Sequence, residues 1–453
     1  MDIFQKIHLG KYREEEIDIP LSAFEAFKRL YGNFRTMFLL ESLGEEGKYN
    51  RYSYVGFDPT FLIHARGKNL TINGKSYEVT NPYRQLSTFT RLNDNAHDFS
   101  GGLVGYISYE GTQYFEKAFT PKSNREFSDF AFGFYPDGLK FDKKTRRCIY
   151  FHHGQSRRRM VLGVLHGSGD LQSFSFKTLA SQSSQKHHSA IVAKAKQEIK
   201  KGNIFQVVLS VRTNYHLFGD TRRLYAAIRS INPSPYMSYL KFGEQEILSA
   251  SPELLIRVKG RYIEHFGTLA GTISRGESEK EDEKLAVQLK ADEKEMAEHM
   301  MLVDLARNDV GKICKFGSIS IDKLASVKPY SHVQHLYSEI RGRLRENETV
   351  FSALAACFPA GTLTGAPKIE AMKIINSLES EPRGPYGGVI GYASLNGEAM
   401  FSIAIRSIFA HGQYAYTQTG SGIVLDSKVT HEYQEIINKQ KAMEEALRLA
   451  QGE

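Results

Sequence analysis

Two pairs of glutamates stand three residues apart in segments that are predicted to be helices. Glu295 and Glu298 lie within ADEKEMAEH, residues 291–299, and Glu432 and Glu435 open the last expected helix. Because residues three apart share one helix face, each pair presents its two carboxylates together. Two such pairs can converge on one hard divalent cation, which prefers oxygen ligands. Solvated surface acids are the alternative, since charged helix faces are common.

A single arginine, Arg406, stands in the apolar run FSIAIRSIF, which is predicted to belong to a strand over residues 398–410. Burying an unpaired guanidinium is costly, so this side chain needs an acceptor. An internal carboxylate would satisfy it, and so would the carboxylate of a substrate held by two parallel hydrogen bonds. Tyr386 in RGPYGG and the backbone N–H groups of Gly420 and Gly422 are candidates to bind the same anion.

Glu253, in SASPELLIRV, is an acid among apolar residues. Burial there would raise its pKa toward the range of a general acid, although a helix cap or an internal salt bridge is the alternative role. The glycine-rich turn GTLTGAPK at 361–368 lacks the glycine spacing of a phosphate loop and the Ser or Thr that follows its lysine. Its exposed backbone N–H groups still make it a candidate anion site, with a purely structural turn as the alternative.

The composition is that of a soluble globular protein with a large buried core: 453 residues, 41% hydrophobic and 24% charged. The N-terminal segment is too charged for a signal peptide and no long apolar run follows, so a cytoplasmic protein is expected. Three scattered cysteines argue against a disulfide scaffold and a zinc site. The net charge of +8 suits small anionic substrates, and basic residues interleaved with acids do not form the stripe of a nucleic-acid-binding protein. Neither a nucleic acid nor a membrane is expected as a partner.

The elements that position these residues fall into two predicted regions. Residues 1–180 carry hairpin signals at Asn73-Gly74 and Asp137-Gly138 and are predicted to be mostly β. The polar stretch 181–189 marks the expected internal boundary, and residues 190–453 mix helices with strands.

The second region carries most of the chemically interesting side chains. Helical spacing of apolar residues predicts one long helix from about Glu277 to Arg307, which contains the first glutamate pair. After Cys357 a loop and a helix lead into a predicted antiparallel meander. Its second and third strands, 398–410 and 414–425, follow a type I′ turn at Asn396-Gly397.

Short stretches in order along nearly the whole chain carry a family resemblance. They include GNIFQVVLS at 202–210, DEKEMAEHMMLVDLARNDVG at 292–311, FPAGTLTGAPK at 358–368, IAIR at 403–406 and EYQE at 432–435. On these residues the chain resembles the chorismate-utilising enzymes, and among them the large subunits of anthranilate synthases. The resemblance implies an α+β fold of two large antiparallel sheets packed together, with helices outside. It also implies that the regions 1–180 and 190–453 are intertwined.

Carried over position by position, the resemblance assigns roles to the residues above. It implies that Mg²⁺ is bound directly by Glu298 and Glu435 and through water by Glu295 and Glu432, and that the metal holds the ring carboxylate of chorismate. It implies that the enolpyruvyl carboxylate of the substrate is bound by Arg406, Tyr386, Gly420 and Gly422. Further contacts to the substrate are implied for Thr272, His335 and Lys439. Glu253 matches the general acid for loss of the ring hydroxyl, and His335 is a candidate participant in the later elimination of pyruvate.

Two positions discriminate between activities within the family. Isochorismate and salicylate synthases carry lysine where this chain has Gln206, because water needs a base to become a nucleophile whereas ammonia does not. Aminodeoxychorismate synthases commonly carry an attacking lysine where this chain has Ala270. The implied reaction is therefore amination of chorismate followed by elimination of pyruvate, giving anthranilate for tryptophan biosynthesis. An aminodeoxychorismate synthase subunit is the alternative.

A reading in a different class is a non-catalytic relative that senses tryptophan or binds nucleic acid. Intact Glu298, Glu435, Arg406 and Gln206 argue against it. One departure from the family pattern is Ile273, directly after Thr272, where the family usually has arginine. The charge of this loop is therefore expected to differ from that of the family.

Partners and regulation also follow from the resemblance. None of the three cysteines lies in a GxCxG nucleophile elbow, so a separate glutamine amidotransferase subunit is expected to supply ammonia. The segments LLES and NPSPYM match the two parts of a tryptophan feedback pocket. The residues implicated in that pocket are Glu41, Ser42, Pro235, Tyr236 and Met237.

Overall fold

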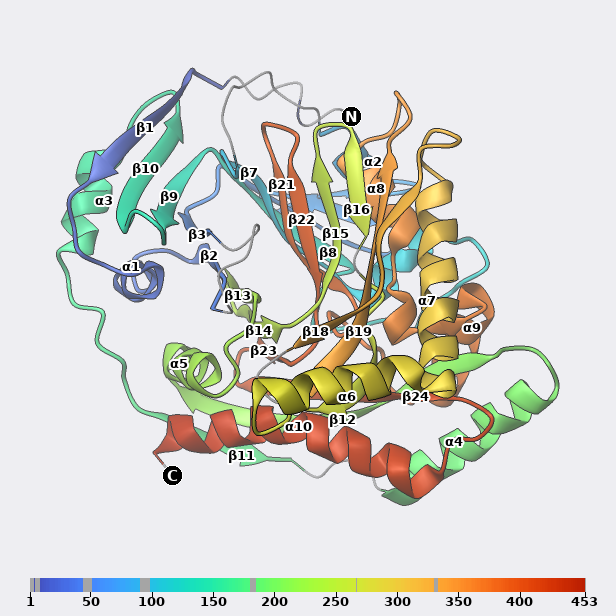
Figure 1. The fold of residues 1–453 in the computed structure, drawn as a ribbon. Helices are drawn as coiled ribbons and strands as arrows, with labels where there is room; N and C mark the ends of the chain where they lie inside the picture. Colours follow the sequence, from blue (N-terminus) through green and yellow to red (C-terminus); the bar gives the residue numbers. More distant parts are fainter. Residues whose placement is uncertain are drawn as a thin grey trace.

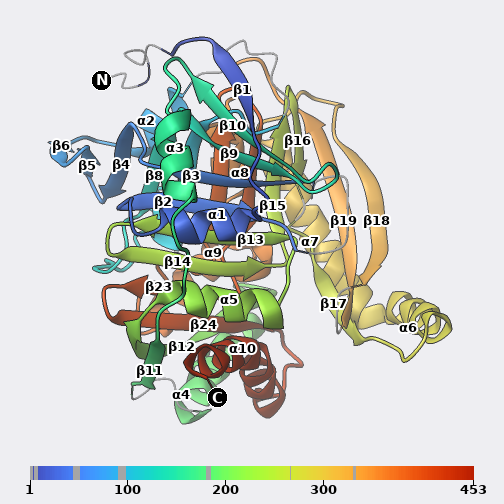
Figure 2. The same cartoon turned by 90° about the vertical axis from the view of Figure 1, so that its left-hand side faces the viewer.

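Two twelve-stranded antiparallel sheets form the centre of the molecule in a computed structural model, with helices on the outside (Figures 1 and 2). The structure describes residues 4, 9–43, 51–89, 98–179, 185–265, 267–329 and 333–452, apart from the side chains of 270 and 272. The two packed antiparallel sheets with outer helices confirm the expected α+β architecture. Among these residues no helix is long and apolar enough to cross a membrane. A cytoplasmic location stays a prediction.

The first sheet, sheet A, combines strands from distant parts of the chain. In spatial order its strands are β1 (Tyr12–Ile17), β10 (Arg147–His153), β9 (Asp137–Asp142), β3 (Tyr52–Phe57), β2 (Thr36–Glu41), β13 (Tyr236–Phe242), β14 (Gln245–Ser251), β23 (Ser407–His411), β24 (Tyr414–Ile423), β12 (Gln206–Gly219) and β11 (Phe174–Thr178), with β20 (Gly365–Ala366) beside β12.

The second sheet, sheet B, is built in the same way. Its strands are β17 (Ala270–Ser274), β19 (Val333–Arg343), β16 (Tyr262–His265), β15 (Leu254–Lys259), β22 (Ala399–Ile403), β21 (Val389–Ser394), β7 (Gly102–Ile107), β8 (Phe130–Tyr135), β4 (Phe61–Arg66), β5 (Asn69–Ile72) and β6 (Lys75–Glu78), with β18 (Ser320–Pro329) beside β19. Both sheets thus mix strands from the two halves of the sequence. The division into 1–180 and 190–453 stays a prediction.

Helices cover the outer faces of the sheets. They are α1 (Ala23–Leu30), α2 (Tyr83–Ser87), α3 (Arg158–Leu165), α4 (Gln185–Lys200), α5 (Thr221–Ile231), α6 (Glu279–Ala291), α7 (Glu293–Gly311), α8 (Val350–Cys357), α9 (Lys368–Leu378) and α10 (Val429–Gln451), with short 3₁₀ turns η2 (Tyr109–Tyr114) and η3 (Gly361–Leu363). In Figure 1, α10 crosses the base of the molecule and α7 stands upright beside sheet B. These two helices carry the glutamate pairs.

The largest hydrophobic core lies between the two sheets. Phe38 of sheet A meets Tyr135 of sheet B with ring centroids 4.7 Å apart at 84°. Because β7 packs on both faces, all six of its residues, GLVGYI, are buried. A second core fills the space between sheet A and helices α1, α3, α5 and α10. This packing makes a rigid base for the polar residues at the sheet ends.

The prediction of a single helix from Glu277 to Arg307 is wrong, because the helix is interrupted at Asp292, where α6 ends and α7 begins. Asp292 has an extended backbone and caps α7, accepting hydrogen bonds from the backbone N–H groups of Lys294 and Glu295, each at 3.0 Å. An aspartate that satisfies these N–H groups starts a new helix in a new direction. Glu295 therefore stands in the first turn of α7 rather than in mid-helix.

Two predicted hairpin connections are also wrong. Asp137-Gly138 does not join two paired strands, because β8 belongs to sheet B and β9 to sheet A. The predicted strand 398–410 likewise divides: β22 ends at Ile403 in sheet B and β23 begins at Ser407 in sheet A. The predicted meander is thus two hairpins in two sheets. The turns at Asn73-Gly74 and Asn396-Gly397 are confirmed as hairpins, the first with both residues at positive φ.

Candidate active site

Four carboxylates from α7 and α10 come within electrostatic reach of one another. Burial raises the pKa of Glu298, and the negative charges of Glu295, Glu432 and Glu435 raise it further against the opposing charge of Lys294. The two helices are far apart in the sequence, so only the tertiary fold can assemble these acids. The four carboxylates repel one another, and a bound cation would relieve this repulsion.

The donor set fits a hard cation, since all four ligands would be carboxylate oxygens. Lysines neutralise two of the acids: Lys294 Nζ lies 3.8 Å from Glu298 Oε1, and Lys439 Nζ lies 2.5 Å from Glu435 Oε1. Within the described ranges, no three acidic, histidine or cysteine side chains stand close enough to form a ready metal shell. A cation would therefore compete with these two lysines for the acids.

Glu253 is buried immediately before β15, with 6% of its surface exposed. Burial raises the pKa of its carboxyl to about 8, although a hydrogen bond from Thr362, another from the backbone of Leu269 and the charges of Arg406 and Lys439 oppose the shift. The Thr362 hydroxyl donates to Glu253 Oε1 over 3.1 Å. A carboxyl that keeps its proton near neutral pH is equipped to protonate a leaving group.

His335 on β19 has a defined tautomer. Its Nδ1 lies 3.0 Å from the carbonyl oxygen of Gly271, which can only accept, so Nδ1 carries the hydrogen and Nε2 is an acceptor. Burial lowers the pKa of the ring to about 4, and the positive charges of Arg406 and Lys439 lower it further against the hydrogen bond to Gly271. The ring is therefore neutral at physiological pH. In the β17–β19 ladder His335 pairs with Thr272, whose side chain lies outside the described atoms.

Gly271 links the histidine to the acid cluster. It has φ +67°, and a Cβ there would lie 3.2 Å from Glu295 Oε2. The backbone of Gly271 therefore faces His335 through its carbonyl and the carboxylate of Glu295 through its Cα. A side chain at this position would be strained and would push against that carboxylate.

The end of β24 forms a narrow cradle between polar side chains. A Cβ at Gly420 would lie 2.9 Å from the hydroxyl of Tyr386, and one at Gly422 would lie 2.7 Å from Gln206 Nε2. Lys439 Nζ donates to the carbonyl oxygen of Gly420 at 3.2 Å. The two glycines thus let the strand backbone approach the site closely enough to offer its N–H groups to a ligand.

Arg406 lies in the link between β22 and β23 rather than in a strand, which corrects the expectation. Its φ is +50°, a left-handed conformation that is unfavourable for residues other than glycine. Its carbonyl accepts a hydrogen bond from Ala250 at 3.1 Å, and its charge acts on Glu253 and His335. The sheet crossing therefore holds the guanidinium beside the buried acid and the neutral imidazole.

No pattern in the sequence predicted two ion pairs that hold this site together. Lys368 of the glycine-rich turn pairs with buried Asp309 at 2.5 Å, which fastens that turn to α7 and leaves the lysine unsuited to a phosphate. Arg383 and Glu379 form a fully buried pair at 2.7 Å, just before the turn that carries Tyr386. Thr362 was not predicted to be a site residue either, although it lies in the candidate anion-binding turn GTLTGAPK.

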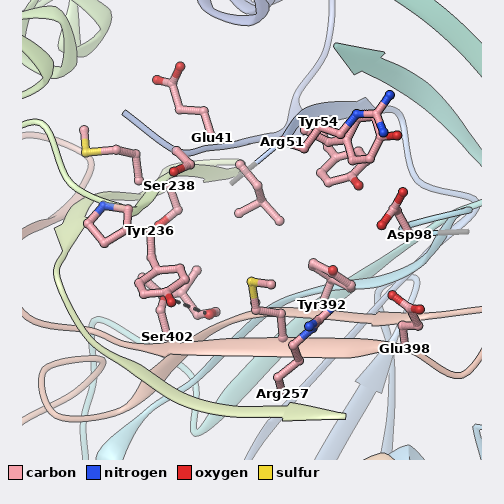
Figure 3. A pocket seen from close by; sticks show the side chains of 18 residues that line it. Glu41, Arg51, Tyr54, Asp98, Tyr236, Ser238, Arg257, Tyr392, Glu398 and Ser402 are labelled. Carbon is pink, nitrogen blue, oxygen red and sulfur yellow. Dashed lines mark hydrogen bonds between the residues drawn. The ribbon is translucent and has the colours of Figure 1, made fainter. Parts of the chain in front are cut away.

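A separate cavity of about 260 Å³ lies between the two sheets. It is lined by all five residues expected in a feedback pocket, Glu41, Ser42, Pro235, Tyr236 and Met237, and by side chains of sheet B such as Arg257, Tyr392 and Ser402 (Figure 3). The carboxylate of Glu41 points away from the sheet B side chains in Figure 3 and pairs with Arg229 at 2.6 Å.

Two hydroxyls that line this cavity are buried without a hydrogen-bond partner among the described residues, namely those of Ser42 and Ser238. Buried polar groups are rarely left unpaired, so both hydroxyls would gain a partner from a ligand whose polar groups reach them. The cavity is large enough for a small amphipathic molecule with polar ends.

The chain is similar to known proteins along nearly its whole length. The family model described as chorismate binding enzyme matches residues 36–445. Anthranilate synthase component 1 of Methanothermobacter marburgensis is 42% identical over 99% of this chain and 98% of the relative. That of Leptospira biflexa is 42% identical over 95% of this chain and 94% of the relative. Aminodeoxychorismate synthase component 1 of Bacillus subtilis is 34% identical over 95% and 96% of the two chains.

Solved structures show the same fold. Anthranilate synthase component I from Streptococcus pneumoniae aligns with a TM-score of 0.78 at 34% identity, covering 95% of this chain and 99% of that one. The Escherichia coli isochorismate synthase MenF aligns with a TM-score of 0.74 at 19% identity, covering 98% and 96%.

Proposed function

The chain belongs to the chorismate-binding enzyme family, and from that premise we propose that it is the large subunit of an anthranilate synthase. It converts chorismate and ammonia to anthranilate and pyruvate, as a lyase of tryptophan biosynthesis. The relatives of higher identity carry the anthranilate synthase name, and the aminodeoxychorismate synthase relative is less similar. The observation that carries the proposal is the convergence of Glu253, His335, Arg406 and Lys439 beside the paired acids of α7 and α10.

The nitrogen nucleophile is favoured by Gln206. Its amide Nε2 faces Gly422, and its Oε1 is buried without a hydrogen-bond partner among the described residues. An amide cannot take a proton from water but can accept a hydrogen bond from ammonia. At position 270 alanine offers no amine to attack the ring, so the covalent route that lysine would provide is absent.

The reaction divides into two steps. In the first, ammonia bonds to the ring carbon beside the carboxyl-bearing one, the ring double bonds shift, and the ring hydroxyl takes up the proton of Glu253 and leaves as water; the attached nitrogen then releases its extra proton. In the second, His335 Nε2 accepts the proton from the ring carbon that received the nitrogen as the bond between the ring and the enolpyruvyl oxygen breaks, which makes the ring aromatic. The enolpyruvate that leaves takes up a proton on its methylene carbon and becomes pyruvate. Arg406, the hydroxyl of Tyr386 and the cradle at Gly420 would hold the enolpyruvyl carboxylate during both steps.

Mg²⁺ is the cofactor of this proposal. Glu298 and Glu435 would bind it directly, and Glu295 and Glu432 would act through its waters, as suits an all-oxygen donor set. When bound, the ion supplies Lewis-acid polarisation of the substrate's ring carboxylate. With the ion bound, the acids on α7 and α10 would hold the ring-carboxylate end of the substrate.

Ammonia would reach the site from a partner. The relatives are named component 1, which implies a second component, and we propose a glutamine amidotransferase subunit in that role. Free ammonium salts at high concentration should replace it.

Tryptophan is proposed as a feedback inhibitor that occupies the cavity between the sheets. The aromatic and apolar lining suits its indole ring, and the unpartnered hydroxyls of Ser42 and Ser238 suit its polar groups. The cavity shares β15 and β22 with the catalytic residues, since Glu253 precedes β15 and Arg406 follows β22. A ligand that spreads the two sheets would therefore displace both.

Product analysis tests the function directly. Purified protein, chorismate, an ammonium salt and Mg²⁺ at alkaline pH should yield the fluorescence of anthranilate, and omission of Mg²⁺ should abolish it. A para-aminated product would support the aminodeoxychorismate alternative instead. Binding of chorismate without any amination would identify a non-catalytic relative.

A further inference from the structure

A second cavity, of about 820 Å³, lies at the edge of sheet B, and we call it the edge cavity. It is lined by residues of β4, β5, β6 and β8 and by the turn between β13 and β14 of sheet A. In Figure 2, β4, β5 and β6 project on the left, above the left-hand end of β14. The edge cavity shares no lining residue with the cavity proposed for tryptophan and contains none of the proposed catalytic residues.

The part of sheet B that lines the edge cavity carries a row of polar side chains on one face. In the strand ladders His64 pairs with Ala131 on one side and with Thr71 on the other, and Thr71 pairs with Ser76. Arg66 follows His64 by two residues and therefore stands on the same face. The row runs across β4, β5 and β6 and ends at the edge of the sheet.

The same face of sheet B is aromatic where sheet A covers it. Tyr106 of β7 pairs with Ala131 and is fully buried. Its ring stacks on that of Phe242 in sheet A, with centroids 6.2 Å apart at 28°. The change from aromatic rings to hydroxyl, imidazole and guanidinium groups therefore coincides with the edge cavity, as expected for a site that binds a polar ligand beside an apolar wall.

Three arginines line the edge cavity. Arg66 donates from Nη2 to the backbone carbonyl oxygens of Arg125 and Phe127 at 3.0 and 3.3 Å, which holds the loop before β8 beside the cavity. Arg35 lies against the β13–β14 turn, since a Cβ at Gly243 would be 3.4 Å from its Nε. In the part of the chain that the structure describes, no carboxylate forms an ion pair with Arg35, Arg66 or Arg125. Their guanidinium groups can therefore pair with an anion in the cavity.

Two glutamates also line the edge cavity, and both lie beside other groups. The carboxylate of Glu244 is 3.8 Å from Nε2 of His411. The charge of Glu126 adds to burial in raising the pKa of Tyr414 on β24, so this carboxylate lies near sheet A. The two acids thus leave the arginines unneutralised by direct pairing.

His64 responds to the positive charge of the edge cavity. Burial lowers the pKa of its ring, and the charge of Arg66 lowers it further. Nδ1 of the ring lies 3.4 Å from the hydroxyl of Ser128. The ring is therefore neutral at physiological pH and offers a ligand a hydrogen bond rather than a charge.

We propose that the edge cavity binds a small organic phosphate whose body carries hydroxyl groups. The phosphate group faces the guanidinium groups of Arg35, Arg66 and Arg125. A phosphate ester carries nearly two negative charges at neutral pH and accepts paired hydrogen bonds from arginine, so it suits these groups better than a single carboxylate. The hydroxyls of the ligand lie along Thr71 and Ser76, whose own hydroxyls both donate and accept hydrogen bonds.

Calorimetric titration of the full chain with ribose 5-phosphate tests this proposal. We expect saturable binding with a Kd below about 1 mM, and affinities at least about tenfold lower for ribose and for inorganic phosphate. Absence of saturable binding would overturn the proposal. Equal affinity for inorganic phosphate and the ester would reveal a site for the anion alone and would overturn the role of the polar row.

Substitutions in the lining place the ligand. Arg35→Gln and Arg125→Gln should each raise the Kd for ribose 5-phosphate about tenfold, as for loss of a charged hydrogen bond. Thr71→Val should weaken binding of the ester but not of inorganic phosphate. Arg13→Gln is the matched control, because Arg13 is exposed on β1, five strand spacings or about 24 Å from β13. Unchanged binding in both cavity arginine variants, or equal weakening by Arg13→Gln, would contradict the assignment.

Competition separates the edge cavity from the two sites proposed above. Millimolar tryptophan or chorismate should leave the Kd for ribose 5-phosphate unchanged, because neither proposed site shares a lining residue with this cavity. Displacement by either compound would place the probe in the other site and overturn the proposal. Arg35→Gln should keep the ammonium-dependent rate within about twofold of the wild type, which shows that the variant is folded.

Discussion

The hydroxyl of Thr362 donates a hydrogen bond of 3.1 Å to Oε1 of Glu253, across the boundary between the glycine-rich turn and β15. A donated hydrogen bond stabilises the charged carboxylate and so lowers the pKa of Glu253 against the upward effect of burial. Thr362 is therefore a positioning residue that sets both the orientation and the protonation of the proposed general acid.

Thr362→Val should move the alkaline limb of the pH profile of kcat/KM upward. The pKa of Glu253 is about 8, so activity that needs its proton falls as pH rises through that value. Without the hydrogen bond, worth about 1 kcal/mol, the pKa rises by about 0.7 and the limb follows. The profile is measured at constant unprotonated ammonia. Thr362→Ser should restore the original limb, and an unmoved limb in the valine variant would refute the role.

Glu298→Gln should abolish Mg²⁺-dependent turnover. It removes a partly buried charge of the acid cluster and with it a proposed direct ligand of the metal, so we expect kcat to fall by about a thousandfold. Calorimetric titration with Mg²⁺ should show lost binding as well. Glu293→Gln, an exposed acid in the first turn of the same helix, is the control and should change neither quantity. Near-normal turnover in Glu298→Gln would contradict the assignment of Glu298 as a metal ligand.

Arg406→Gly and Arg406→Ala should separate the function of this arginine from its backbone. Both delete the guanidinium, so both should lower kcat/KM for chorismate by about a hundredfold or more. Because φ at this position is +50°, glycine relieves strain that alanine retains. Urea denaturation should find Arg406→Gly more stable than Arg406→Ala by about 1 kcal/mol. Equal stabilities would show that the backbone there is unstrained.

Ser42→Ala and Ser238→Ala should each weaken tryptophan inhibition. Loss of one hydrogen bond to a bound ligand, about 1 kcal/mol, corresponds to a rise of about fivefold in the inhibition constant. The uninhibited rate should stay unchanged because the cavity is separate from the substrate site. Ser168→Ala, on the exposed surface, serves as the control. If millimolar tryptophan leaves the wild-type rate unaffected, the feedback proposal is abandoned.

Glu379→Gln should destabilise the protein by about 3 kcal/mol. Arg383 is buried and pairs with Glu379, so removal of the negative charge leaves an uncompensated guanidinium in the interior. Glu370→Gln breaks the exposed pair with Lys373, whose side chains are 41% and 47% exposed, and should cost less than about 0.5 kcal/mol. Chemical denaturation measures the free energy of unfolding of both variants. Equal losses of stability would mean that burial of the Arg383–Glu379 pair does not increase its contribution.

Tight turns and short spacings were predictable because they depend on neighbours within a few residues. Asn73-Gly74 and Asn396-Gly397 are hairpin turns as predicted, since both dipeptides favour the positive φ that a two-residue turn requires. The same local rules failed at Asp137-Gly138 and across 398–410, where the chain crosses from one sheet to the other. A turn signal is the same whether the next strand pairs with the last or joins a different sheet.

The sequence by itself determined which chemical groups this protein owns: the two glutamate pairs, the arginine, the acid before β15 and the order of motifs that carries the family resemblance. Only the tertiary structure decided how those groups meet. The sheet crossing gives Arg406 its left-handed backbone, the packing of α7 near α10 assembles the four carboxylates, and the glycine-rich turn brings Thr362 to Glu253. Burial, and with it the pKa of each group, depends on contacts between residues hundreds of positions apart, which no local pattern contains.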